Sequence, residues 1–152
     1  MNNVRVAIVG SITTQEQVAK VKKAEQYIQK NDSVSEMVSL GKELTIFFEN
    51  PTVHDSDWVS YYFDLILSAI EGKMDFLVLV VDGYSRAGIG WLTAMAWERG
   101  VKVILLYTDE FINLGLLVDY CSHATLYGMK ELIKYDFQEA PVVTQIRVNK
   151  IQ

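Results

Sequence analysis

The chain has 152 residues, half of them apolar, and carries 14 basic and 19 acidic side chains for a formal net charge of −5. This length and composition fit one domain that buries a core of its own. Acidic residues outnumber basic ones, and the longest run of basic residues is the pair Lys22-Lys23. Both features argue against nucleic acid as a partner.

The chain also lacks the marks of a membrane or secreted protein. Its longest unbroken apolar run, residues 76–81, is far shorter than the roughly 20 residues that a helix needs to cross a bilayer. Its first residues do not combine a basic region with a long apolar one, as a secretion signal does. The single cysteine, Cys121, has no partner for an internal disulfide. We therefore expect a cytoplasmic location, no membrane partner, and neither a metal nor another cofactor.

Strand and helix signals alternate from the start of the chain. Residues 4–9 form a short β-branched apolar run that ends at Gly10-Ser11. Thr13, with Glu16 three residues later, predicts a capping box that opens a helix. Apolar residues then recur at helical spacing over residues 18–28, which gives this helix one apolar face.

A second strand and a second helix are predicted in the next segment. Residues 44–48 are typical of a strand, and a polar loop follows them. The Asp-Ser-Asp sequence of residues 55–57 offers caps for a helix. The apolar side chains of that helix share one broad stripe, which consists of Trp58, Tyr61, Tyr62, Leu65, Ile66 and Ala69.

The second half of the chain repeats this alternation. Residues 76–81 are apolar without alternation, which is typical of a strand covered by helices on both faces. A helix is predicted to begin near Ile89, a fourth strand to span residues 101–107, and a shorter fifth strand to span residues 124–127.

Strands and helices in this order predict the fold class α/β, with a flavodoxin-like or Rossmann-like doubly wound parallel sheet of about five strands in a single domain, residues 1–152. Near the end, residues 129–135 suit a helix. Within residues 136–152, the apolar segment 142–148 suits an edge strand or an arm that reaches a neighbouring subunit. In such a sheet, ligands bind outside the carboxyl ends of the strands, where the strand order reverses.

Two loops at those carboxyl ends carry groups that suit a phosphate. Gly10, Ser11 and Ile12 place backbone N–H groups and a hydroxyl at a predicted helix start, and residues 85–90 add a guanidinium to a glycine-bearing turn. Glycine lets a ligand oxygen approach the backbone because no Cβ intervenes. The alternative is that these glycines serve only tight turns between strand and helix. The candidates in the second loop are Ser85, Arg86, Gly88 and Gly90.

The order of these features resembles the nucleoside 2-deoxyribosyltransferase superfamily, which includes the 2'-deoxynucleoside 5'-monophosphate N-glycosidases. The resemblance spans residues 4–107. It rests on the Gly-Ser strand end, a helix carrying Asp64, a strand ending in Asp82, the glycine turn, and a small-residue helix that closes at Gly100. It implies a nucleoside or nucleotide as ligand, chemistry at an N-glycosidic bond, and a homo-oligomer whose neighbouring chains complete the pocket.

The resemblance also implies roles for single residues. Gly10, Ser11 and Ile12 correspond to the loop that touches sugar or phosphate, and Asp64 corresponds to an aspartate near the ribose. Leu92 falls on the glutamate that attacks the anomeric carbon in the family. Leucine cannot attack this carbon, and an oxocarbenium-like centre needs a carboxylate beside it.

Each candidate also has a second interpretation. Leu92 either marks a lost nucleophile in the pocket or packs into the core with Ile89, Thr93, Ala96 and Trp97. Asp64 is either a site carboxylate or an ordinary surface acid. Arg86 is either a phosphate clamp or an exposed loop arginine. Trp91, with Tyr84, flanks the glycine turn, where a base or sugar can rest against the rings.

Three functions follow from these alternatives. The favoured hypothesis is a nucleoside 2-deoxyribosyltransferase-like protein that binds a nucleoside or nucleotide without the covalent glycosyl transfer. The second is an active N-glycosidase or deoxyribosyltransferase in which Asp64 or Asp82 activates a water. The third is a flavodoxin-like interaction domain without chemistry in a pocket.

Overall fold

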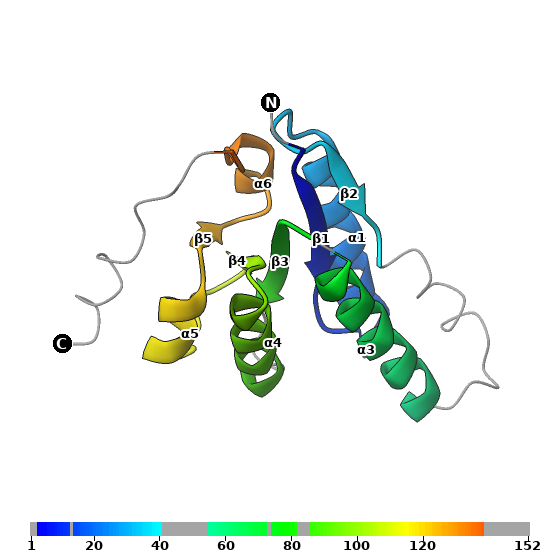
Figure 1. Cartoon of the computed structure of the whole chain (residues 1–152). Coiled ribbons are helices and arrows are strands. Elements are labelled where there is room, and N and C mark those ends of the chain that lie inside the picture. Colours follow the sequence, from blue (N-terminus) through cyan, green and yellow to red (C-terminus); the bar gives the residue numbers. More distant parts are fainter. Residues whose placement is uncertain (1–2, 13, 41–54, 73, 82–85, 139–152) are drawn as a thin grey trace.

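The computed structural model describes residues 3–12, 14–40, 55–72, 74–81 and 86–138 (Figure 1). Among these residues, no helix has the length and apolar character needed to span a membrane. The elements are, in chain order, β1 (Arg5–Val9), α1 (Gln15–Gln29), β2 (Glu36–Val38), α3 (Asp55–Glu71), β3 (Phe76–Val81), α4 (Arg86–Glu98), β4 (Lys102–Tyr107), α5 (Leu116–Cys121), β5 (Ala124–Tyr127) and α6 (Glu131–Lys134).

The five strands of the described residues form one sheet in the order β2-β1-β3-β4-β5, and every pair is parallel. The chain runs from β1 outward to β2, and then returns to β3 on the other side of β1. The strand order therefore reverses at β1, as in a doubly wound α/β fold. The fold class predicted from the sequence is confirmed.

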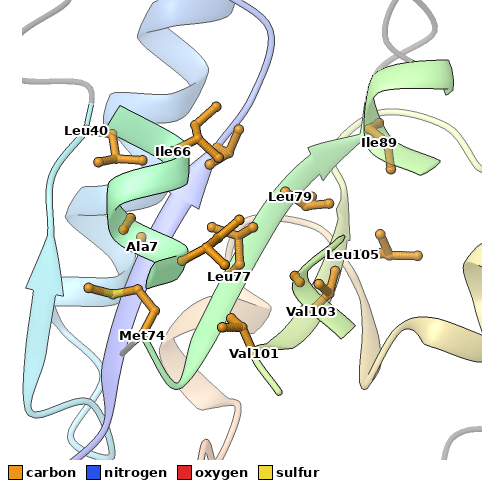
Figure 2. Packing of buried hydrophobic residues seen from close by; sticks show 14 of the residues in the cluster. Ala7, Leu40, Ile66, Met74, Leu77, Leu79, Ile89, Val101, Val103 and Leu105 are labelled. Carbon is orange, nitrogen blue, oxygen red and sulfur yellow. The ribbon is translucent and has the colours of Figure 1, made fainter. Parts of the chain in front are cut away.

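The two faces of the sheet carry separate apolar clusters, and β3 contributes to both. Leu77 and Leu79 pack with residues of α3 and α4 (Figure 2), whereas Phe76 and Val78 pack with residues of α1 and α6. Burying a side chain of this size stabilises a fold by about 1.5–3 kcal/mol. Because helices cover β3 on both faces, its sequence is apolar without alternation.

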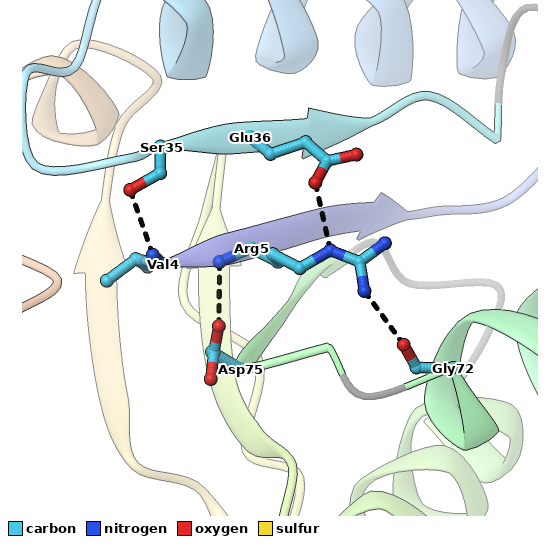
Figure 3. A network of polar contacts seen from close by, with 6 residues as sticks. All are labelled: Val4, Arg5, Ser35, Glu36, Gly72 and Asp75. Carbon is cyan, nitrogen blue, oxygen red and sulfur yellow. Dashed lines mark hydrogen bonds and ion pairs between the residues drawn. The ribbon is translucent and has the colours of Figure 1, made fainter. Parts of the chain in front are cut away.

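A polar network holds the amino ends of β1, β2 and β3 together (Figure 3). The Arg5 guanidinium donates to Glu36 at 3.0 Å and to the Gly72 carbonyl at 2.9 Å, and the Arg5 backbone N–H donates to Asp75 at 2.8 Å. The β2 side is further linked by the Val4 N–H, which donates to the Ser35 hydroxyl at 3.0 Å. These contacts fix the amino ends of the three strands, at the end of the sheet opposite the predicted site.

The capping box of α1 lies one residue later than predicted. The Thr14 hydroxyl accepts from the Gln17 N–H, and the Gln17 side chain accepts from the Thr14 N–H. The prediction used Thr13 with Glu16, and Thr13 lies outside the described residues. The sequence satisfies the same motif in two registers, so spacing could not separate them.

The second strand of the sheet was not predicted. β2 has only three residues, of which Glu36 is exposed, and it pairs with β1 alone at the edge of the sheet. Such a short edge strand gives no buried apolar run in the sequence. The strand predicted at residues 44–48 lies outside the described residues.

Later elements follow the prediction more closely. β4 and β5 lie within one residue of the predicted ranges, whereas α6 is shorter than the predicted helix at residues 129–135. The predicted arm at residues 142–148 lies outside the part of the chain that the structure describes.

Candidate functional site

The carboxyl ends of β1 and β3 lie side by side, because these strands pair in parallel with Val9 opposite Leu79. α1 follows β1 and packs on the face that contains Ile8, while α4 follows β3 and packs on the face that contains Val9. The two helices therefore start at the same end of the sheet on opposite faces (Figure 1). We call this region, made by the two strand ends and the two helix starts, the switch-point site.

On the β1 side, packing alone accounts for Gly10. A Cβ added there would lie 2.7 Å from Cγ2 of Val21 and 3.2 Å from Cβ of Val80, so a larger residue does not fit without movement. The N–H of Gly10 donates to the Tyr62 hydroxyl at 3.2 Å, and the hydroxyl donates to the Gly10 carbonyl at 3.2 Å. Burial raises the pKa of Tyr62 well above its usual range, so its hydroxyl stays neutral. The fold thus uses both backbone groups of Gly10.

The rest of the first loop is also largely occupied by internal contacts. Ile12 is 5% exposed and belongs to the core, and Ser11 is half-buried. The capping box engages the N–H groups of Thr14 and Gln17 at the start of α1. The β1 side therefore offers a ligand fewer groups than the sequence suggested.

On the β3 side, the helix begins earlier than predicted. α4 starts at Arg86, three residues before the predicted start near Ile89, so Arg86 and Gly88 lie in its first turn and Gly90 follows them in the helix. Glycine lowers helix propensity by about 1 kcal/mol relative to alanine, which is why the sequence suggested a turn. The buried side chains of Ile89 and Thr93 anchor the helix instead.

The two glycines of α4 are not required by packing. A Cβ added at Gly88 would find no described atom within 4 Å, and one added at Gly90 would meet Cγ2 of Val118 at an ordinary 3.5 Å. Neither glycine has a positive φ. The first turn of α4 contains no acidic residue, and Arg86 is exposed. Helix starts with exposed N–H groups favour anions, so this start has the charge and the space for one.

Two aromatic rings lie beside these glycines. Trp91 is 48% exposed, and its ring stacks on Phe63 of α3 with centroids 5.2 Å apart and planes 23° apart. The sequence singled out Trp91 but missed Phe63, because nothing in the spacing shows that residues 28 positions apart meet. The pair presents an aromatic surface that bridges α3 and α4.

Leu92 packs against the core cluster between the sheet and its α3–α4 layer, and it is half-buried. The packing interpretation of Leu92 is in this respect confirmed, and Ile89, Thr93 and Ala96 are buried with it. Trp97 was wrongly placed in that buried stripe, because it is 55% exposed.

Of the two predicted carboxylates, Asp64 alone belongs to the described residues. Asp64 is exposed on α3, two residues after Tyr62 and thus about 200° around the helix. Because Tyr62 faces Gly10, Asp64 lies on the opposite side of α3. Asp82, Tyr84 and Ser85 lie outside the described residues.

A second group of side chains at this end of the sheet was missed. Tyr107, at the end of β4, stacks on Phe111 at 5.2 Å and on Tyr127, at the end of β5, at 5.5 Å. Lys20 of α1 donates to Asp109 at 2.6 Å, and this hydrogen bond holds the pKa of Asp109 below its usual value. These contacts hold the loop after β4 in place. The sequence could not predict them, because they join residues that meet only at the carboxyl ends of the strands.

The strand order and the helices define a doubly wound α/β protein, and the solved structures that it is similar to give this fold as nucleoside 2-deoxyribosyltransferase-like. The chain is similar to a 2-deoxyribosyltransferase from the psychrotolerant bacterium Bacillus psychrosaccharolyticus, with a TM-score of 0.67 and 23% identity over 92% of this chain and 98% of that one. It is also similar to a conserved protein from Enterococcus faecalis V583, with a TM-score of 0.58 and 16% identity over 90% of this chain and 99% of that one. Neither a family model nor a curated protein sequence matches the chain.

Proposed function

We propose that the switch-point site binds a nucleoside or nucleotide and that it does so without covalent glycosyl transfer. The observation that carries this proposal is Gly88. It lies in a helix where alanine would be about 1 kcal/mol better, yet neither packing against the described residues nor its backbone conformation requires glycine there. A ligand that approaches the backbone at the start of α4 gives a physical reason for it. The likeness to the fold of a 2-deoxyribosyltransferase supports a ligand of this class.

The described side chains suggest how each part of such a ligand is held. The phosphate or sugar lies at the first turn of α4, where the N–H groups and the Arg86 guanidinium donate to oxygen. The base rests on the exposed surface of Trp91 and Phe63, because every nucleobase offers a π-face. The β1 side, filled by Tyr62 and the capping box, forms a rigid wall.

The missing nucleophile supports binding over transfer. The resemblance assigns Leu92 to the position of the attacking glutamate, and Leu92 packs on the core. Its side chain has no lone pair with which to form a glycosyl–enzyme bond. Loss of a covalent nucleophile costs on the order of 10⁴ to 10⁶ in rate by analogy with other enzymes.

A panel of deoxynucleosides and their 5'-monophosphates tests this proposal. Thermal unfolding is followed with each ligand, and release of the free base is followed by chromatography. We expect a rise in melting temperature without base release. Base release would instead favour the hydrolytic alternative, with Asp82 as its carboxylate because Asp64 faces away from Gly10. No shift with any ligand would favour a plain interaction domain.

The variant Leu92→Glu tests the assignment of the nucleophile position. If the pocket is intact, we expect base release to appear in this variant with a ligand that the parent chain only binds. Leu92→Gln is the matched control, since it has nearly the same size and polarity but no carboxylate. A folded Leu92→Glu chain that still binds nucleotide and releases no base would contradict the assignment.

We further propose that the chain self-associates through the outer surface of α3, α4 and α5. Large apolar side chains are exposed on these helices, among them Phe63, Trp91, Leu116 and Leu117, and Leu117 is 79% exposed. Because Phe63 and Trp91 also form the surface proposed for the base, a neighbouring chain would complete that surface. The outer surface of α1 carries exposed polar residues instead, among them Lys23 and Gln26. Large exposed apolar patches commonly mark interfaces. Sedimentation should show a concentration-dependent oligomer that Leu117→Lys weakens and Gln26→Lys leaves unchanged.

A further inference from the structure

His123 lies beside Phe76, where β3, β4 and β5 begin, on the face of the sheet that α1 and α6 cover. The imidazole meets the Phe76 ring edge-on, with centroids 5.5 Å apart and planes at 71°. The Lys102 ammonium lies 5.4 Å from the centroid of the same ring. Phe137 also packs on this ring at 5.0 Å, and both phenyl rings are buried. An imidazole and an ammonium therefore share one aromatic neighbour at the edge of the apolar cluster.

The backbone of His123 attaches the start of β5 to the sheet. Its N–H donates to the Val103 carbonyl of β4 at 2.7 Å, directly before the first residue of β5. At the other end of the strand, the Tyr127 ring stacks on Tyr107 of β4 at 5.5 Å. Among the described strands, β5 lies at the edge of the sheet and pairs with β4 alone. A change in the charge of His123 therefore acts on a strand that is held from one side.

The surroundings of His123 favour a neutral imidazole. Its Nε2 atom is buried and has no hydrogen-bond partner within the part of the chain that the structure describes. A neutral imidazole has one donor and one acceptor nitrogen, whereas the protonated ring has two donors and a positive charge. Burying an unpaired charge costs far more than burying an unpaired neutral group. Protonation of His123 is therefore unfavourable while β5 stays in place.

The described charge that acts on the His123 imidazole is itself positive. Burial lowers the pKa of His123 most, and the charge of Lys102 lowers it further. The carboxylates of Asp75 and Asp136 accept instead from backbone N–H groups, at 2.8 and 2.9 Å. Protonation in acid would thus place a second positive charge beside Lys102. The titratable side chains on the segments around His123 and Phe76 are Asp75, Lys102, Asp119, Tyr120, Cys121, Tyr135 and Asp136.

We propose that His123 is a pH-sensitive switch, which holds β5 to the sheet while the imidazole is neutral and loosens this strand when the imidazole takes up a proton. The pKa of His123 is lower in the folded chain than its ordinary 6.5, so a chain in which β5 has opened binds the proton more readily. The contribution of the neutral imidazole to stability is therefore complete above pH 6.5 and is lost as the pH falls from there through the lowered pKa. The proposal does not depend on the function of the switch-point site.

Amide hydrogen exchange, followed by mass spectrometry, tests this switch. Exchange is compared at about pH 7.5 and about pH 5, after correction for the intrinsic effect of pH on amide exchange. We expect the protection of β5 to fall at least about threefold in acid relative to that of β3. β3 is the internal reference, because it pairs with a strand on each side.

Three variants show which group is responsible. In His123→Gln no imidazole is present to take up the proton, and we expect the ratio of β5 to β3 protection to stay the same at both pH values. His54→Gln is the matched control, because His54 is the only other histidine of the chain, and it should keep the loss seen in the parent. Lys102→Met removes the neighbouring ammonium, so the pKa of His123 should rise and the loss in acid should shrink.

An NMR titration of the imidazole signals provides a second readout on the parent chain, which decides even if His123→Gln does not fold. The spectrum of His54→Gln assigns the two histidines. We expect the His123 signal to titrate below pH 6.5. Three results would overturn the proposal: titration of His123 at or above this value, unchanged protection of β5 in acid, or an equal loss of protection in folded His123→Gln.

Discussion

The two helix starts of the switch-point site look alike in the sequence and differ in the structure. At α1, Gly10 is held between Val21 and Val80, and the capping box and Tyr62 occupy nearby backbone groups. At α4, Gly88 has no described atom within 4 Å of the place where a Cβ would stand. A glycine-bearing helix start thus points to a ligand only where packing does not already explain the glycine.

The sharpest way to break this comparison is to add one methyl group on each side. Gly10→Ala should destabilise the fold by about 1–3 kcal/mol, because the new Cβ overlaps Val21 and the sheet. Gly88→Ala should stabilise it by about 0.5–1 kcal/mol, since the methyl group enters open space in a helix. Urea denaturation measures both. Equal effects of the two substitutions would refute the distinction.

Tyr62→Phe tests the β1 side through a hydrogen bond. The substitution removes the hydroxyl that serves both the N–H and the carbonyl of Gly10. We expect a loss of about 1–2 kcal/mol, because two backbone groups are left without this partner. Thermal or urea unfolding checks the value. A Tyr62→Phe chain with an unchanged free energy of unfolding would show that these hydrogen bonds do not hold the loop.

Thr14→Ala tests whether the start of α1 is closed by its own side chains. Loss of this N-cap should cost about 1 kcal/mol, because the Gln17 N–H loses its acceptor. Gln15→Ala, an exposed neighbour in the first turn, is the control and should change stability little. If Thr13→Ala lowered the stability and Thr14→Ala left it unchanged, the capping box would instead be the pair Thr13 and Glu16 that the sequence suggested.

The smallest effect is expected at the Lys20–Asp109 pair, which ties α1 to the loop after β4. The Asp109 side chain is 69% exposed, so Lys20→Met should cost only about 0.2–1 kcal/mol at neutral pH. The pKa of Asp109 is lower in the folded chain than its usual 3.8, so this contribution is complete above that value and is lost as the pH falls through the lowered pKa. The gap between parent and variant, measured by urea denaturation, should narrow in acid. A gap that widens in acid would contradict the pairing.

The sequence predicted the layers of the fold well because buried parallel strands are unmistakable. The run Phe76–Val81 is apolar on both faces, and β5 matches its predicted range. β2 escaped prediction because three residues at a sheet edge bury too little to leave a pattern.

The sequence predicted which end of the sheet holds the site, but it predicted the residues of the site only in part. Topology alone places ligands near the ends of β1 and β3. Spacing along the chain cannot show that Val80 fills the space at Gly10, or that Phe63 stacks on Trp91. The reason for each glycine therefore emerges only from its neighbours in space.

The most direct test of the account places a side chain in the open space at the start of α4. The affinity for the deoxynucleoside 5'-monophosphate that gives the largest thermal shift is measured by calorimetry for Gly88→Gln and for Ala94→Gln, an exposed position later on the same helix. We expect Gly88→Gln to bind at least about tenfold more weakly while being at least as stable as the parent, and Ala94→Gln to bind normally. Equal affinity in all three chains would show that no nucleotide approaches Gly88.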